Sequence, residues 1–422
     1  MRTETYGAFS EALHRAGVSG HLPLNGTFEI THRCPLTCSH CYNNLPMGDA
    51  AARNRELTRD EHYRLLAELA EAGCFWLLYT GGEIFARHDF LDIYTRARQS
   101  GFLITLFTNG TLITPRVADH LAEWRPWAIE ITLYGRTRET YERLTGVPGS
   151  FDKCMRGIDL LLERGLPLAL KTVAVSINRH EVWDMQRFAE DLGVEFKFDG
   201  AMNPRIDCSQ SPLAVRLSPE EVVAFDMEDS KRLNEWDLFA EKHFKPANPP
   251  ERQDELYYCG GGVDSFSIDP YGNMSICILS QKDKFDLRTG SLLEGWGTFL
   301  RAVRSKKITA PTKCTECELK TMCGMCPANG ELENGDPEAP VDFLCRVAHL
   351  RAYTFGLPFG RHGDCEYCES GVGHAEMMQA VSRLKQLTPG DRKPLTKRVL
   401  PLLLQAEGGC STGGGCQSCG AH

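Results

Sequence analysis

The stretch that decides the fold is TFEITHRCPLTCSHCY, residues 27–42. Its first five residues, 27–31, are mostly apolar or β-branched, which predicts a buried strand. Three cysteines follow this strand, Cys34, Cys38 and Cys41, spaced C-x3-C-x2-C and followed by Tyr42. Three thiols in one loop predict a metal site, but the nearby sequence offers no fourth thiol.

Five further runs with strand character follow at regular intervals, at residues 75–79, 103–107, 128–133, 168–175 and 195–199. They lack a clean two-residue alternation, which predicts parallel strands buried on both faces. Helix signals lie between them: a capping box at Thr58–Glu61 with Gly73 at the helix end, Thr114-Pro115, and Ser150 as a cap with Gly165 at the end. Six strand–helix units predict an α/β chain with a partial parallel (β/α)6 barrel. An open doubly wound sheet is the alternative, but its Gly-rich nucleotide turn is absent after the first strand.

Composition narrows the classes of function. The chain has 422 residues, with 24% charged and 42% hydrophobic residues and a net charge of −9, which disfavours a nucleic-acid partner. It shows no signal peptide and no apolar run of the ~18 residues needed to span a bilayer, so we expect a cytoplasmic protein without membrane contact. Its 18 cysteines then indicate metal binding or chemistry rather than disulfides.

Three thiolates can each take one iron of a [4Fe–4S] cube, which leaves the fourth iron open. The C-x3-C-x2-C spacing followed by an aromatic residue resembles the signature of the radical S-adenosylmethionine (SAM) enzymes. The resemblance implies that Cys34, Cys38 and Cys41 hold the cluster and that SAM's methionine groups bind the fourth iron. It also implies reductive cleavage of SAM to a 5′-deoxyadenosyl radical, which abstracts a hydrogen atom. A zinc knuckle or a plain electron-transfer cluster is the alternative.

Other residues fit the same resemblance. YTGGE at residues 79–83 matches the family's GGE motif, whose turn contacts the ammonium group of SAM. The implied cofactor-binding residues are Tyr42, Gly81, Gly82, Glu83, Asn109, Thr132 and Arg143. For Arg143 a surface arginine, and for Asn109 a simple turn residue, are equally good interpretations. Four positions are candidates for substrate contact or core: Tyr79, Tyr134, Lys197 and Asp199.

A second set of cysteines resembles the SPASM domain, a module that holds two auxiliary iron–sulfur clusters. Its seven members are Cys259, Cys277, Cys314, Cys317, Cys323, Cys326 and Cys345. The resemblance implies a distal cluster on Cys314, Cys317, Cys323 and Cys345, and a nearer cluster on Cys259, Cys277 and Cys326. The nearer cluster then lacks one ligand, which a substrate thiolate, a tail cysteine or Asp264 could supply. A zinc ribbon would use four of these thiols and leave three unexplained.

These patterns divide the chain into an extension at 1–25, the barrel at 26–205, a helical connector at 206–255, the SPASM domain at 256–350 and a tail at 351–422. Isolated Cys74, Cys154 and Cys208 are expected to be small, buried apolar residues. The tail cysteines have several open interpretations: another metal site, the missing cluster ligand, transfer of reducing equivalents, or no role. They are Cys365, Cys368, Cys410, Cys416 and Cys419.

SPASM-bearing relatives mostly modify peptides, so the resemblance implies a peptide or protein substrate that gains a cross-link or an oxidised residue. It also implies an external electron donor of the flavodoxin or ferredoxin type and a separate partner for leader-peptide binding. A sulfatase-maturase activity is less favoured, because that branch has Asp where Ile278 follows Cys277. A small-molecule dehydrogenase or epimerase is a further alternative. A multi-cluster electron carrier without SAM chemistry is disfavoured by Gly81-Gly82-Glu83.

Overall fold

The computed structural model describes residues 5–243 and 254–387, and Cys410, Cys416 and Cys419 lie outside these residues. The described chain forms two compact units. The first comprises residues 5–215 and 260–304, and the second comprises residues 216–243, 254–259 and 305–387. The segment predicted as one domain at 256–350 therefore contributes to both units.

A nine-stranded sheet, ordered β11-β10-β9-β1-β4-β5-β6-β7-β8, forms the framework of the first unit. Six of its strands are parallel neighbours: β1 (Asn25–Thr31), β4 (Trp76–Gly81), β5 (Leu103–Thr108), β6 (Ala128–Thr132), β7 (Leu168–Val173) and β8 (Glu195–Asp199). These are the six predicted strands in the predicted order. The predicted α/β class with a parallel partial barrel is confirmed.

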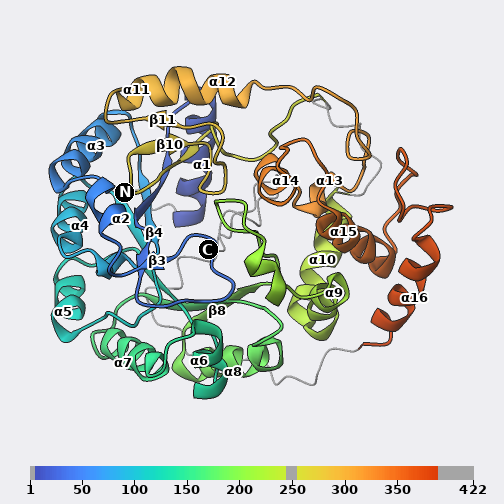
Figure 1. Cartoon of the computed structure of the whole chain (residues 1–422), viewed down its shortest axis with the longest axis horizontal. Coiled ribbons are helices and arrows are strands. Elements are labelled where there is room, and N and C mark those ends of the chain that lie inside the picture. Colours follow the sequence, from blue (N-terminus) through green and yellow to red (C-terminus); the bar gives the residue numbers. More distant parts are fainter. Residues whose placement is uncertain (1–4, 244–253, 388–422) are drawn as a thin grey trace. The chain divides into compact units, whose positions relative to one another are not determined.

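Helices separate the strands and lie around the outside of the sheet (Figure 1). They are α2 (Ala50–Arg55), α3 (Arg59–Glu71), α4 (Phe90–Gln99), α5 (Pro115–Glu123), α6 (Arg138–Thr145), α7 (Ser150–Glu163) and α8 (Val182–Leu192), with α1 (Tyr6–Gly20) before the first strand. The predicted capping box at Thr58 and Glu61 is present, and Thr114 caps α5 ahead of its first-turn proline. The prediction that Ser150 caps α7 is wrong. Gly149 takes that position in the left-handed region at φ 77°, while the Ser150 hydroxyl lies 2.8 Å from the Thr145 hydroxyl.

The two faces of the sheet differ in character. Phe28, Tyr79 and Phe198 face the helices, where their rings meet His62 of α3, Phe90 of α4 and Trp183 of α8 respectively. Successive strand residues point to opposite sides, so the register places a second set on the other, inner face. This set includes Glu29, Phe107, Glu130, Thr132, Lys171 and Lys197.

The prediction of strands buried on both faces is wrong in part. Along β5, buried residues alternate with half-buried ones, and β8 has no buried residue. The half-buried residues of β5 are those on the inner face, and β8 lies at the edge of the sheet, where it pairs with β7 alone. Glu29, Glu130 and Lys171 of the inner face are nevertheless buried.

Residues 260–304 extend the sheet on the other side of β1. Strand β9 (Ser265–Ile268) pairs in parallel with β1, and β10 (Asn273–Ser275) and β11 (Phe285–Asp286) add antiparallel strands. The helical elements α11 (Leu292–Glu294), η4 (Gly295–Leu300) and α12 (Arg301–Arg304) follow. The indole of Trp296 donates a hydrogen bond to the carbonyl of His21, which ties this segment to the end of α1.

The second unit is helical in its described residues. Its helices are α9 (Pro219–Glu228), α10 (Ser230–His243), α13 (Lys320–Cys323), α14 (Pro327–Asn334), α15 (Asp342–Phe355) and α16 (His374–Leu384). Helix α15 packs against α9, α13 and α16. The fully buried carboxylate of Asp226 accepts hydrogen bonds from Arg232 and Arg351, which joins α9, α10 and α15. No helix within the described part of the chain combines the length and apolar character needed to cross a bilayer.

Candidate functional site

The cysteine loop, residues 34–42, leaves the carboxyl end of β1 through the short strand β2 (Arg33–Cys34), which pairs with β3 (Leu45–Pro46). The backbone amides of Thr37 and Ser39 donate to the carbonyls of Thr145 and Leu144 at the end of α6. The guanidinium of Arg205 donates to the carbonyl of Cys41 at 3.3 Å. The loop is thus held from both sides, which fixes where its thiols lie.

The structure brings the three predicted cluster ligands together. Cys34 and Cys38 are buried and Cys41 is half-buried, and none of the three forms a disulfide. Burial raises the pKa of all three thiols, and the neighbouring Cys34 and Cys41 raise the pKa of Cys38 further. Three close thiolates are therefore stable here only beside a strong positive charge, which an iron cluster supplies.

Gly81 and Gly82 allow two chain segments to approach closely. The amide of Gly82 donates to the carbonyl of Thr31 at 2.6 Å, and the amide of Glu83 donates to the carbonyl of Arg33 at 3.0 Å. Gly81 has φ 127°, and a Cβ there would lie 2.3 Å from the Thr31 oxygen. A Cβ on Gly82 would lie 2.5 Å from the Arg33 oxygen. Both glycines are required for the turn to pack against the residues that lead into the cysteine loop.

The carboxylate of Glu83 points into the protein. It accepts hydrogen bonds from the Thr108 hydroxyl at 2.7 and 2.9 Å and from the Asn109 amide at 2.8 Å. Burial raises the pKa of Glu83 to about 7, although the hydrogen bonds from Thr108, Asn109 and Phe85 act in the opposite direction. Glu83 thus joins the end of β4 to the end of β5.

Asn109 is a candidate residue whose side chain contacts one of the loop cysteines. Its Nδ2 donates to the Cys34 sulfur at 3.4 Å, while its Oδ1 accepts from the amide and hydroxyl of Thr111. The Oδ1 contacts orient the amide group so that its N–H groups face the thiol. Hydrogen bonds to cluster sulfurs influence the electronic properties of iron–sulfur sites.

The remaining candidates lie in different environments. Thr132 is half-buried at the end of β6 on the inner face, and Arg143 is exposed on α6. The hydroxyl of Tyr42 donates to the Glu29 carboxylate at 3.0 Å. The Tyr134 hydroxyl is hydrogen-bonded to Cys38. Tyr79 is fully buried on the helix-facing side, which makes it a core residue.

Sequence reasoning named Lys197 but overlooked Glu130 and Lys171, which form a charged group with it on the inner face. Lys197 and Lys171 place their ammonium nitrogens 2.8 and 3.4 Å from the two carboxylate oxygens of Glu130. Burial lowers the pKa of Lys171 to about 7, although Glu130 opposes the shift. Glu29 accepts from both Tyr42 and Asn43 beside the cysteine loop. The signal was present for Glu29, Glu130 and Lys171, because each is the one charged residue of its strand.

The second set of cysteines is divided between the units. Cys277 belongs to the first unit, whereas Cys259 and Cys326 belong to the second. The four predicted distal ligands all lie in the second unit, and Cys345 is on α15. The pKa of Cys323 is raised by burial and by neighbouring Cys317 and Cys314, and Cys323 in turn contributes to the raised pKa of Cys345. These interactions connect Cys323 with the other three predicted distal ligands.

Comparison with known proteins agrees with this geometry. The family model "Radical SAM superfamily" matches residues 28–192. A PqqA peptide cyclase of Ruegeria pomeroyi is 32% identical over 344 residues, covering 76% of this chain and 87% of that protein. An AdoMet-dependent heme synthase of Methanosarcina barkeri is 24% identical over 332 residues, covering 73% of this chain and 92% of that protein.

The fold is also found among solved structures. Streptococcus suis SuiB bound to S-adenosylmethionine matches with a TM-score of 0.59 and 19% identity, over 80% of this chain and 79% of that one. The predicted [4Fe–4S] cluster and SAM are the cofactors of the matched family. The similarity to the Ruegeria cyclase and the family match over the barrel point to the same family as the three thiols at the first strand. The chain belongs to the radical SAM superfamily.

Proposed function

We propose that the cysteine loop holds the [4Fe–4S] cluster through Cys34, Cys38 and Cys41 and that SAM binds beside it. The observation that carries the proposal is the group of three thiols, two buried and one half-buried, with the Asn109 amide directed at Cys34 at 3.4 Å. Three ligands leave one iron for SAM. The residues fit this cluster because the thiols are close and are not joined by disulfides.

When bound, the cluster and SAM supply one-electron cleavage of SAM and a 5′-deoxyadenosyl radical. The chain's own residues do the rest. The Gly81-Gly82 turn and the inner face position SAM, with Thr132 as a ribose or carboxylate contact and Tyr42 packed behind the loop. Arg143 is exposed on α6, so it serves the SAM carboxylate only if its long side chain reaches the site.

The substrate we propose is a peptide or protein, which receives a cross-link or an oxidised residue. The support is the similarity to a PqqA peptide cyclase along most of both chains. Glu130, Lys171 and Lys197 lie on the inner face, where ionic contacts with polar groups of a peptide could form. We further propose that the enzyme is a SPASM-type oxidoreductase with an external flavodoxin or ferredoxin as donor and a separate leader-binding partner.

The auxiliary clusters are part of the same proposal. The distal cluster is held by Cys314, Cys317, Cys323 and Cys345, which interact through Cys323 in the second unit. The nearer cluster is held by Cys259, Cys277 and Cys326. Its remaining ligand is a substrate thiolate, a tail cysteine or Asp264.

A tetrapyrrole is the second candidate for the substrate. The AdoMet-dependent heme synthase covers nearly as much of this chain as the cyclase does, at lower identity. The inner-face lysines could pair with carboxylate side chains of such a substrate. This alternative predicts turnover of a small anionic molecule without any peptide.

The experiment is anaerobic incubation of the reconstituted protein with dithionite and SAM, followed by chromatography for 5′-deoxyadenosine. The control is the variant with Cys34, Cys38 and Cys41 replaced by Ala. We expect product from the wild type alone. We then add either peptides encoded beside the gene or porphyrin precursors. The class of compound that raises the rate of 5′-deoxyadenosine formation is the substrate class. No product under any of these conditions, with the clusters present and reduced, would favour the electron-carrier alternative.

A further inference from the structure

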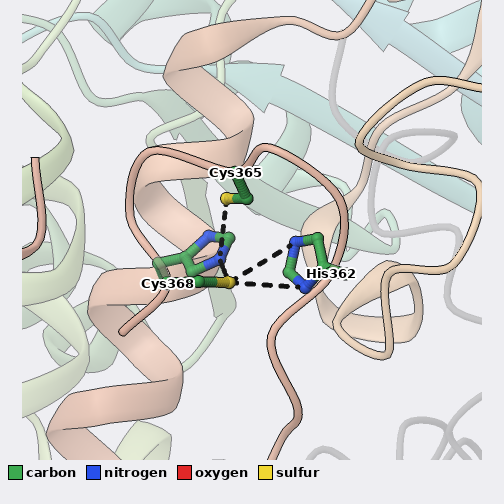
Figure 2. A group of neighbouring side chains, drawn as sticks. His362, Cys365 and Cys368 are labelled. Carbon is green, nitrogen blue, oxygen red and sulfur yellow. Dashed lines mark hydrogen bonds between the residues drawn. The ribbon is translucent and has the colours of Figure 1, made fainter. Parts of the chain in front are cut away.

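Four buried side chains gather in the second unit, outside the predicted cluster ligands. They are His349 on α15 and His362, Cys365 and Cys368 on the segment that follows it (Figure 2). Their exposed fractions are 1%, 3%, 1% and 0% in the same order. One potential ligand atom from each lies within 4.8 Å of all the others. Cys-x2-Cys with two histidines is a donor set that structural zinc sites use.

The spacing of these atoms fits a tetrahedral ion. Sulfur and nitrogen ligands at the usual zinc distances lie about 3.6 Å apart along the edge of a tetrahedron. The His349 Nε2 lies 3.4 Å from the Cys365 sulfur and 3.6 Å from the Cys368 sulfur. The Cys368 sulfur lies 3.5 Å from Nδ1 of His362. Three of the observed edges thus already have the length that a bound zinc ion requires.

The protonation state of His349 is set by its second nitrogen. Nδ1 lies 2.8 Å from the carbonyl oxygen of Cys345, which can only accept a hydrogen bond. Nδ1 therefore carries the proton, and the lone pair of Nε2 points toward the two thiols. An imidazole that donates one N–H to a backbone carbonyl and offers the other nitrogen to the ion is the usual arrangement of a metal-binding histidine.

The segment that carries the other three residues is irregular and is held by side-chain contacts, including Tyr367 with Asp342 and Lys313 with Glu366. Residues 356–373 contain no helix or strand between α15 and α16. The chain nevertheless buries Cys365 and Cys368 in a tight turn, where a Cβ on Gly371 would lie 2.3 Å from the carbonyl oxygen of Glu366. A short irregular segment with buried polar donors is stabilised well by a metal ion, which binds only when the ligands are assembled.

The group lies directly against the predicted distal ligands, and His362 is hydrogen-bonded to Cys317. Cys345 lies one helical turn before His349, and its thiol is hydrogen-bonded to Cys365. Lys313, next to Cys314, forms an ion pair with Glu366 at 2.8 Å. The distal cluster already has four cysteines of its own by resemblance, so it does not need these side chains.

We propose that His349, His362, Cys365 and Cys368 form a structural Cys2His2 zinc site. Binding of Zn²⁺ takes the two thiols to thiolates and releases two protons to solvent. The ion cross-links the middle of α15 to the segment that leads into α16. Since α15 also carries Cys345, the site stabilises the helix that presents a ligand of the distal cluster.

The test measures metals on the full-length protein, isolated without oxygen from cells grown with both iron and zinc. We expect one zinc per chain that survives gel filtration with EDTA. X-ray absorption at the zinc edge should show two sulfurs at about 2.3 Å and two nitrogens at about 2.0 Å. Cys368→Ser and His362→Gln should lose this zinc and keep their iron. His362→Cys should retain it, because a Cys3His set also binds zinc.

Cys208→Ser is the matched control, since Cys208 is exposed, contrary to the burial expected from the sequence, and belongs to the first unit. It should keep both metals. Wild-type protein without zinc, or zinc surrounded by four sulfurs, would overturn the proposal. The proposal would also be wrong if zinc remained in the folded Cys368→Ser variant. If the wild type held no zinc and the Cys368→Ser variant lost iron, the Cys368 thiol would instead be a ligand of an auxiliary cluster. The X-ray absorption spectrum of the wild type tests the proposed zinc ligands even if a variant fails to fold.

Discussion

The cysteine loop of the first unit and the Cys2His2 group of the second unit, defined above by His349, His362, Cys365 and Cys368, are both buried. They differ in the number of donors. The loop offers three thiols, one of them half-buried, beside the polar inner face of the sheet. The Cys2His2 group offers four donors, each no more than 3% exposed. An open position suits catalysis, whereas a complete donor set suits structure.

The surroundings of the two groups also differ, since those of the cysteine loop are polar and those of the Cys2His2 group are aromatic. Asn109 donates a hydrogen bond to the Cys34 sulfur, and Glu29, Glu130 and Lys171 line the nearby face of the sheet. Aromatic rings surround the Cys2His2 group instead, with Phe359 and Tyr367 against His349. A polar surface beside an open ligand position can bind a substrate, while a hydrophobic shell keeps water and substrate out.

The largest expected effect separates the two groups completely. Replacing Cys34, Cys38 and Cys41 together by Ala should abolish formation of 5′-deoxyadenosine, because the loop then holds no iron–sulfur cluster to bind SAM. The same variant should keep its zinc. Chromatography measures the 5′-deoxyadenosine formed, and metal analysis of the same sample measures the zinc. Loss of zinc together with the loop cluster would show that the two groups depend on each other.

The next effect concerns the close approach at the glycine turn. Gly82→Ala places a Cβ 2.5 Å from the Arg33 oxygen and 2.6 Å from the His32 oxygen, and both are backbone atoms that cannot swing aside. The cysteine loop must then shift, which should destabilise the protein by about 1–3 kcal/mol. It should also slow SAM cleavage by about 10²-fold.

Gly48→Ala is the matched control for this turn. Gly48 follows the cysteine loop, and nothing lies within 4 Å of a Cβ built there. Its unfolding midpoint in denaturant and its rate of SAM cleavage should stay close to those of the wild type. Equal rates for the two alanine variants would mean that the turn does not fix the loop.

A smaller effect is expected at Asn109. Asn109→Ala removes the N–H group that contacts the Cys34 sulfur, and losses of such supporting contacts typically cost about tenfold or more in activity. We expect the loop cluster to be retained. Its reduction potential should fall, because a hydrogen bond to sulfur stabilises the more negative, reduced state. Electron paramagnetic resonance during a redox titration measures this shift. An unchanged potential would show that Asn109 is only a turn residue.

The sequence predicted the barrel well because its signals are local. Thr58 and Glu61 form their capping box within one turn, and the six strands are apolar runs with clear ends. The inner face was harder to predict. Glu130 and Lys171 lie on different strands, and only the register of β6 and β7 brings them to the same side of the sheet.

The Cys2His2 group illustrates the same limit. Cys365-x2-Cys368 was visible as a pair, but His349 and His362 were not connected with it. His349 is 16 residues from Cys365 and lies within a helix, where a buried histidine is common. Folding of the segment after α15 is what brings the imidazole to the thiols. Long-range contacts of this kind leave no fixed spacing in a sequence.

The smallest effect tests the charged inner face, which the Cys2His2 group lacks. Burial lowers the pKa of Lys171 to about 7, below its ordinary value near 10. Between these values the unfolded chain binds more protons than the native protein, so the free energy of unfolding should rise with pH. The contribution approaches about 1.4 kcal/mol per pH unit for one proton.

Lys171→Met should remove this rise, while Lys197 still pairs with Glu130 at 2.8 Å. Denaturant titrations of both proteins between about pH 7 and pH 8.5 measure this rise, and the ionisation of the thiols cancels because both proteins share them. The wild type should gain stability relative to the variant over this interval. Below about pH 6 the difference should be constant, because Lys171 is then protonated in both states. Parallel curves across the whole range would mean that water reaches Lys171 and that the inner face is more open than its burial indicates.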